Sequence, residues 1–122
     1  MNKKKILIID DDNRNIFALS ATLKTRSFEC VSSLSAEEAI SLLKNSEHFD
    51  AILIDMMMPD MDGYEAIQVI GASETYGHVP VIAVTAQAMQ GDREKCLDAG
   101  ARAYVPKPID LDLLIGIIEQ NS

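Results

Sequence analysis

The chain has 122 residues and a formal net charge of −8, with 48% hydrophobic and 25% charged residues. This is the usual length of one domain and the composition of an ordinary globular protein, which excludes a disordered, collagenous or coiled-coil chain. The excess of acidic residues argues against nucleic acid as a direct ligand and against an anionic membrane as the main partner.

Five short apolar runs have the length and composition of buried strands. The clearest run, Ile6 to Ile9, is apolar on both faces and too short for a helix. The run Cys30-Val31 is weaker and predicts an edge strand. The remaining strands are expected at Ala51 to Ile54, Val81 to Val84 and Ala103 to Val105.

Helical segments alternate with these runs. Ile16, Leu19 and Leu23 share one helix face, and Ser35 with Glu38 predicts a capping box for a second helix. The other three helices are marked by Ile67 and Ile70 after Gly63, by Cys96 and Leu97 before Gly100, and by Leu113, Leu114, Ile117 and Ile118 after the candidate N-cap Asp110. This alternation predicts an α/β fold with a five-stranded, doubly wound parallel sheet.

The cysteines and histidines show no spacing typical of a redox or metal site. Cys30 and Cys96 lie far apart, and His48 and His78 form no ligand pair, so all four are expected to be structural. The longest stretch without Asp, Glu, Lys or Arg, Thr75 to Gly91, contains too many Gly, Pro and polar residues for a membrane span. We expect a cytoplasmic protein without membrane insertion, because no signal segment precedes the domain.

Polar residues follow the strands at the sheet edge where ligands of open α/β folds bind. They are Asp10, Asp11 and Asp12 after the first strand, Asp55 after the third, Thr85 after the fourth and, beyond Pro106, Lys107 after the fifth. Carboxylates about 4 Å apart repel by ~4 kcal/mol at an effective dielectric near 20, so they must be protonated, partnered or bridged by a cation. Hard oxygen ligands predict Mg²⁺.

Several polar residues near these strand ends also have a structural interpretation that involves no metal or catalysis. Asp12 and Asn13 are as well explained by capping of the first helix as by metal binding. Asp60 and Asp62 are expected to be solvated loop residues. For Asp55 a chemical role is preferred, because a carboxylate beside a metal and an ammonium group can act as a nucleophile towards phosphorus.

The motifs occur in a fixed order along the chain. They are Asp10-Asp11, the segment from Asp55 to Gly63 (Asp55-Met56-Met57-Met58-Pro59-Asp60-Met61-Asp62-Gly63), Thr85-Ala86 and Tyr104-Val105-Pro106-Lys107-Pro108. Together they resemble a response-regulator receiver domain of two-component signalling over the whole chain. The resemblance implies a flavodoxin-like (βα)5 fold with strand order 2-1-3-4-5. It also implies one receiver domain over residues 1–122, without an output domain.

The resemblance implies a phosphoacceptor switch rather than an enzyme that turns over a substrate. Asp55 would accept a phosphoryl group from a phosphohistidine of a sensor histidine kinase or histidine phosphotransfer protein. Asp11, Asp55 and the backbone carbonyl of Met57 would bind Mg²⁺, with Asp10 acting directly or through water. The protein would catalyse only its own phosphorylation and dephosphorylation.

The family pattern also assigns the phosphoryl contacts and the switch. Lys107, Thr85 and the backbone amide of Ala86 would hold the phosphoryl oxygens, and the Lys107-Pro108 peptide would be cis. After phosphorylation Thr85 would move inward and Tyr104 would rotate, which changes the face of the fourth helix, fifth strand and fifth helix. That face would signal to a downstream protein of unknown identity, and a weak homodimer is left open.

Several positions depart from the common family pattern. Met57 and Gln87 replace residues that influence how water reaches the acyl phosphate, and the apolar Met57 predicts slow loss of phosphate. Arg102 replaces a common acid, with little expected effect on the chemistry. The stretches Asn13-Arg14-Asn15 and Gly91-Asp92-Arg93-Glu94 resemble receivers of hybrid sensor kinases.

Three other classes of protein would share part of this pattern. A haloacid-dehalogenase-type aspartyl-phosphate phosphatase would share Asp10-x-Asp12, but Arg14 does not fit its motif. A flavodoxin-like FMN protein would need a hydroxyl- and glycine-rich phosphate loop after the first strand, where this chain has three aspartates. A phosphorylation-independent interaction module remains the main alternative, although Asp11, Asp55, Thr85 and Lys107 argue against it.

Overall fold

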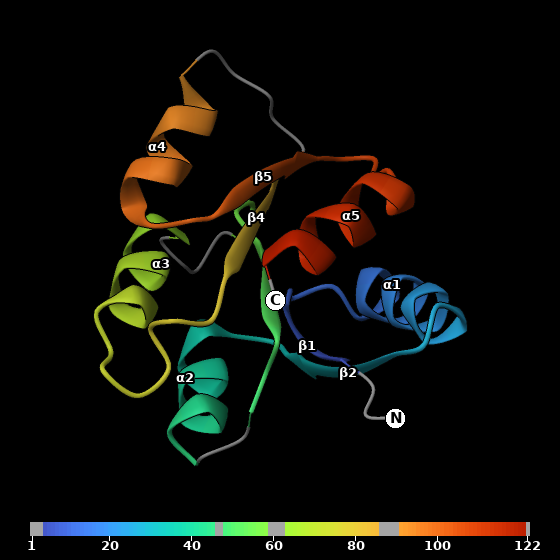
Figure 1. Cartoon of the computed structure of the whole chain (residues 1–122), viewed down its shortest axis with the longest axis horizontal. Helices are drawn as coiled ribbons and strands as arrows, with labels where there is room; N and C mark the ends of the chain where they lie inside the picture. Colours follow the sequence, from blue (N-terminus) through green and yellow to red (C-terminus); the bar gives the residue numbers. More distant parts are fainter. Residues whose placement is uncertain (1–3, 46–47, 59–62, 86–90, 122) are drawn as a thin grey trace.

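The computed structural model describes residues 4–45, 48–58, 63–85 and 91–121. Strands and helices alternate along the chain (Figure 1), in the order β1 (Lys4–Ile9), α1 (Asn13–Thr25), β2 (Phe28–Ser33), α2 (Ala36–Lys44), β3 (Ala51–Asp55), α3 (Gly63–Gly71), β4 (Val81–Thr85), α4 (Asp92–Ala99), β5 (Ala103–Pro106) and α5 (Leu111–Asn121). Each strand expected from an apolar run is present and extends slightly beyond that run. The predicted alternation is confirmed.

The strands form one parallel sheet in the order β2-β1-β3-β4-β5, as expected. β2 is at one edge, which agrees with the weakness of its apolar run. Ile9 is aligned with Ile54, and Asp55 with Val84. This register brings the carboxyl ends of the three central strands to the same level, so the residues that follow them lie close together.

Helices cover both faces of the sheet, with α1 and α5 on one face and α2, α3 and α4 on the other (Figure 1). Successive strand residues point to opposite faces, so Ile8 and Leu53 pack with helices α1 and α5, whereas Ile9 and Ile54 pack with the other three helices. Because both faces are buried, these strands are apolar throughout rather than alternating.

The predicted helix ends are also present. The Ser35 hydroxyl accepts the Glu38 N–H at 3.2 Å, and the Asp110 carboxylate accepts the Leu113 N–H at 3.2 Å. Gly100 follows α4 with a φ of 121°, a left-handed conformation that side chains disfavour. The Lys107-Pro108 peptide is cis, as the family resemblance implied. Among the described residues, no helix has the length and apolar character needed to cross a bilayer.

Candidate functional site

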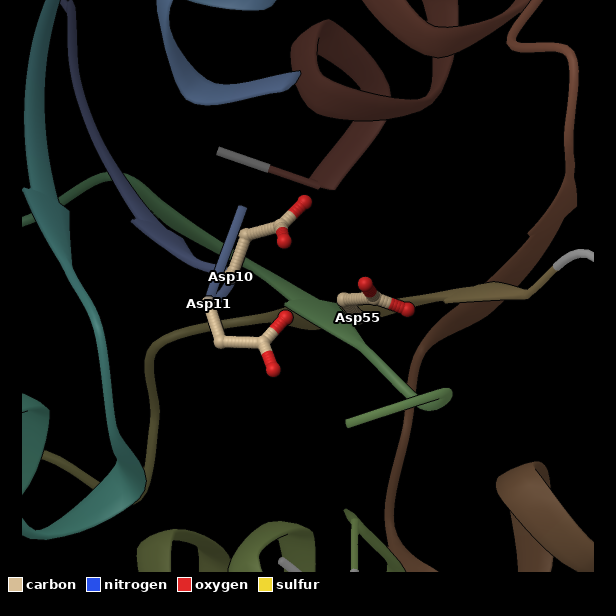
Figure 2. Close-up of side chains that lie close together, drawn as sticks. All are labelled: Asp10, Asp11 and Asp55. Carbon is tan, nitrogen blue, oxygen red and sulfur yellow. The ribbon is translucent and has the colours of Figure 1, made fainter. Parts of the chain in front are cut away.

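Three carboxylates meet at the carboxyl ends of β1 and β3. One oxygen from each of Asp10, Asp11 and Asp55 lies within 4.8 Å of the other two, and Figure 2 shows the three side chains converging. Asp10 and Asp55 are each only 7% exposed, whereas Asp11 is exposed. The sequence prediction that these residues would converge is therefore confirmed.

Backbone hydrogen bonds fix the two buried carboxylates. Oδ1 of Asp10 accepts the Asp12 N–H at 2.9 Å, and Oδ1 of Asp55 accepts the Met57 N–H at 2.9 Å. The Asp10 N–H donates to the Ser33 carbonyl at 3.1 Å, which continues the pairing of β1 with β2. Each carboxylate is held by the turn that follows its own strand, and this makes their approach a property of the fold.

Asp12 belongs to the helix cap. Its carboxylate accepts the Arg14 N–H at 2.9 Å at the start of α1, and this hydrogen bond is the main cause that lowers the pKa of Asp12. Asp12 is also absent from the cluster formed by the other three acids. Of the two interpretations of Asp12, the structure favours capping.

Lys107 brings a positive charge to this edge. Its ammonium nitrogen lies 3.3 Å from Oδ2 of Asp55, and the Lys107 side chain is 25% exposed. The Lys107 N–H donates to the Thr85 carbonyl at 2.7 Å, so β5 is fixed beside β4 where the lysine leaves the sheet. Asp55 therefore has an ammonium group on one oxygen and a backbone amide on the other.

The electrostatics of the site favour a bound cation. Burial is the largest cause that raises the pKa of Asp10, and the Asp55 charge raises it further, although the Asp12 amide and Lys107 act in the opposite direction. Among the described residues, three carboxylates and one ammonium group meet here, so the fully ionised cluster carries an excess negative charge. Hard oxygen donors that lie this close fit Mg²⁺.

Thr85 ends β4 and is 2% exposed. Its hydroxyl lies 3.5 Å from the sulfur of Met57, whose side chain is 40% exposed. Met57 thus contacts the Thr85 hydroxyl and also reaches solvent, on the turn that begins at Asp55. Ala86, Gln87, Asp60 and Asp62, which were also singled out from the sequence, lie outside the described residues.

A cleft beside the acidic cluster opens between α1 and α5. It has a volume of about 340 Å³, and its lining includes Asp10, Asp55 and Lys107 together with Asn15 and Leu19 of α1. The buried carboxylates can therefore be approached by a ligand from this side.

Tyr104 takes part in an interaction that the sequence did not indicate. The Tyr104 hydroxyl donates to Oδ2 of Asp92 at 3.3 Å, and the Tyr64 hydroxyl donates to Oδ1 of the same residue at 2.5 Å. Neither Tyr64 nor Asp92 follows a strand, and the resemblance of the stretch from Gly91 to Glu94 to hybrid-kinase receivers says nothing of a contact with Tyr64. Only the packing of α3 against α4 reveals this contact.

Comparison with known proteins gives a consistent result. The model of the response regulator receiver domain family matches residues 6–119. Histidine kinase 3 of Arabidopsis thaliana is 36% identical over 131 residues, which cover 91% of this chain and 13% of that kinase. The chain thus spans only a small part of that relative.

Two solved structures share the fold over nearly the whole chain. One is the receiver domain of the sensor histidine kinase PA1611 from Pseudomonas aeruginosa PAO1, with magnesium in its active site cleft. It has a TM-score of 0.86 and 34% identity, and 98% of each chain is covered. The other is from the Saccharomyces cerevisiae complex of the histidine phosphotransfer protein Ypd1 with the receiver domain of the response regulator Ssk1. It has a TM-score of 0.83 and 25% identity, and 98% of this chain and 88% of that chain are covered.

Proposed function

Because the chain belongs to the response regulator receiver domain family and is a receiver domain of two-component phosphorelay signalling, we propose that Asp55 is its phosphoacceptor. The observation that carries this proposal is the position of the Asp55 carboxylate. It lies at the end of the central strand β3, between the Asp10 and Asp11 carboxylates and the Lys107 ammonium group. The module is thus a signalling switch that promotes its own phosphorylation.

In the proposed step, a carboxylate oxygen of Asp55 attacks the phosphorus of a phosphohistidine. An O–P bond forms while the P–N bond breaks. The electron pair of the P–N bond stays on the imidazole nitrogen, which then takes up a proton. Lys107 and the Thr85 hydroxyl bind the transferred oxygens, together with the backbone amide of Ala86. Positioned donors of this kind stabilise the charge of a transferring phosphoryl group.

Asp10, Asp11, Asp55 and the backbone carbonyl of Met57 are the proposed ligands of Mg²⁺, with Asp10 acting directly or through water. The three carboxylates fit this role because they are hard oxygen donors close together with too little positive charge around them. The ion would offset the negative charge of the cluster and of the incoming phosphoryl group.

Tyr104 is the proposed output residue. After phosphorylation the Thr85 hydroxyl would bond the new oxygens, and Tyr104 would turn into the space beside it. The affected face is built from α4, β5 and α5, where a downstream protein would bind. A weak homodimer is also part of the proposal.

The donor is proposed to be a sensor histidine kinase or a histidine phosphotransfer protein. Receiver domains work with such proteins, as the yeast complex and the plant kinase illustrate. Residues 1–122 are proposed to act as one receiver domain, since one sheet and its two covering layers include all the described elements. A cytoplasmic location completes the proposal.

The phosphatase alternative is not favoured. It would require Asp12 as a second catalytic acid, whereas the Asp12 carboxylate caps α1 through the Arg14 N–H. The FMN alternative would require a phosphate loop where Asp10 and Asp11 converge on Asp55.

The test uses phosphoramidate, a small donor whose P–N bond matches that of phosphohistidine. With Mg²⁺, the intact mass of the protein should increase by one phosphoryl group, and chelation of Mg²⁺ should suppress the increase. Asp55→Asn should show no addition, and Lys107→Met should react about 100-fold more slowly because a donor to the transferred group is lost. Lys44→Met, an exposed lysine at the end of α2, serves as the control. An addition that survives Asp55→Asn would overturn the proposal.

A further inference from the structure

Two tyrosine hydroxyls converge on one carboxylate away from the phosphoacceptor. Tyr64 lies in the first turn of α3, Asp92 begins α4, and Tyr104 lies in β5. The Tyr64 hydroxyl donates to Oδ1 of Asp92 at 2.5 Å, and the Tyr104 hydroxyl donates to Oδ2 at 3.3 Å. All three side chains are partly buried. One carboxylate therefore links three elements, including the strand that carries the proposed output residue.

The two hydrogen bonds differ in strength. Hydrogen bonds from O–H groups to carboxylates are typically about 2.5–2.7 Å long, and the Tyr64 contact lies within this range. The Tyr104 contact, at 3.3 Å, is longer than the usual O–H···O range of about 2.5–3.0 Å. Tyr64 thus anchors the carboxylate, and Tyr104 is held by the weaker bond. The same contacts affect ionisation, since the hydrogen bond to Asp92 is the main cause that raises the pKa of Tyr64.

The position of Asp92 at the start of a helix also suits a carboxylate. A carboxylate in the first turn of a helix interacts favourably with the positive end of the helix dipole. Asp92 is the first residue of α4. The acceptor of both tyrosine hydroxyls therefore lies where the dipole of its own helix interacts favourably with a carboxylate.

We propose that Asp92 is a positioning residue that holds Tyr104 in the observed rotamer and so opposes the switch to the phosphorylated arrangement. This inference rests on the proposed function, in which Tyr104 turns towards the space beside Thr85 after phosphorylation. Such a turn removes the Tyr104 hydroxyl from Asp92 and breaks their bond. Tyr64 makes α3 part of the same switch, because it fixes the carboxylate from the other side.

Linkage gives this proposal a measurable consequence. A hydrogen bond that forms in only one of two conformations stabilises that conformation. A ligand that binds only the other conformation therefore binds more weakly when the bond is present. Removal of the bond should raise the affinity for that ligand by the same factor by which the bond had lowered it.

The main experiment measures binding of beryllofluoride, a mimic of the phosphoryl group, in the presence of Mg²⁺. Asp92→Ala should bind it about fivefold more tightly than the wild type, a coupling at the lower end of the usual range. Tyr104→Phe should produce a similar gain. In the Tyr104→Phe background, Asp92→Ala should have no further effect, because the hydroxyl that it held is already gone.

The matched control is Asp98→Ala, which removes an exposed carboxylate from the same helix. It should leave beryllofluoride binding unchanged. An equal gain from Asp92→Ala in the wild type and in the Tyr104→Phe variant would show that Asp92 acts only through the stability of α4, and would overturn the proposal. The absence of any gain from Asp92→Ala would overturn it too.

A second readout needs neither Mg²⁺ nor a phosphoryl mimic. The chain has three tyrosines, and their Cζ resonances in a carbon-labelled sample report hydrogen bonding of each hydroxyl. Asp92→Ala should shift the resonances of Tyr64 and Tyr104 and leave that of Tyr76 in place. If wild-type protein failed to bind beryllofluoride, the proposed function would fail while these shifts still confirmed the contact. Unchanged Tyr64 and Tyr104 resonances would contradict the contact itself.

Discussion

At the scale of single residues, Asp10 shows most clearly why a cation is proposed for the site. Burial, followed by the charges of Asp55 and Asp11, raises its pKa above the ordinary value of 3.8. The folded protein therefore binds this proton more tightly than the unfolded chain does. Ionisation of Asp10 therefore lowers the free energy of unfolding as the pH rises from 3.8 to the raised folded pKa. Above that pKa the full loss of stability is present.

Asp10→Asn should therefore stabilise the protein at neutral pH when Mg²⁺ is removed by a chelator. We expect a gain in the free energy of unfolding of about 1 kcal/mol, because a buried like charge is lost. Urea unfolding measures this change. With excess Mg²⁺ the wild type should gain stability as RT ln(1 + [Mg²⁺]/Kd), and the variant should gain less. Equal gains in both proteins would contradict a metal role for Asp10, and Asp98→Asn provides the exposed control.

Met57 is expected to control how long the phosphoryl group persists. Its sulfur lies 3.5 Å from the Thr85 hydroxyl, and its apolar side chain stands at the edge of the site. Met57→Asn should admit water and accelerate loss of phosphate about tenfold, which corresponds to roughly 1.4 kcal/mol of activation free energy. The decay of the phosphorylated mass after removal of the donor measures this rate. Leu113→Asn, at an exposed apolar position of α5, should leave the decay rate unchanged. A fast decay in the wild type that Met57→Asn did not alter would refute the prediction.

The residues of the cluster could be predicted because each lies at the carboxyl end of a strand or within two residues of it. In a parallel sheet, the register of neighbouring strands then determines which side chains meet, as it does for Asp10 and Asp55. Tyr64 and Asp92 could not be predicted in this way. They belong to two helices, and which of their residues face each other depends on how those helices pack.

At the scale of elements, helix caps were readable from the sequence because they are local. The Ser35 hydroxyl accepts the Glu38 N–H at the start of α2. Ser35→Ala should lower the free energy of unfolding by about 1 kcal/mol, since that N–H loses its partner. Ser41→Ala, at an exposed position within the same helix, should cause no such loss in urea unfolding. A smaller loss for Ser35→Ala than for Ser41→Ala would contradict the capping role.

The strand boundaries were harder to predict than the strands themselves. Apolar runs marked the buried centres, but β2 extends over Phe28–Ser33 while only Cys30-Val31 stood out. Polar residues can occupy an edge strand because backbone pairing with β1 holds them there, whatever their side chains. The missing information was therefore tertiary rather than local.

At the scale of the whole molecule, the sheet is the rigid support of the site. Leu53 of β3 is 1% exposed, whereas Leu113 of α5 is 49% exposed. Leu53→Ala should lower the free energy of unfolding by about 2–5 kcal/mol, because it leaves a cavity in the core. Leu113→Ala should change it by no more than about 0.5 kcal/mol. Chemical unfolding of both variants tests this, and similar losses would contradict the assigned layers.

The net charge of −8 argues against nucleic acid and anionic membranes as main partners, and the structure shows where part of this charge lies. Asp10, Asp11 and Asp55 concentrate negative charge where a phosphoryl group is proposed to bind. A second anion can enter such a cluster only if a cation offsets the charge. The requirement for Mg²⁺ and the acceptance of phosphate are therefore two parts of one account.

The most direct measurement locates the phosphoryl group on the chain. After reaction with phosphoramidate and Mg²⁺, borohydride reduces an aspartyl phosphate to homoserine, which peptide mass spectrometry identifies by position. The account predicts homoserine at position 55, and none there when Mg²⁺ is chelated. Homoserine at another aspartate, or a stable phosphoryl group on a histidine or hydroxyl side chain with Asp55 unmodified, would contradict it.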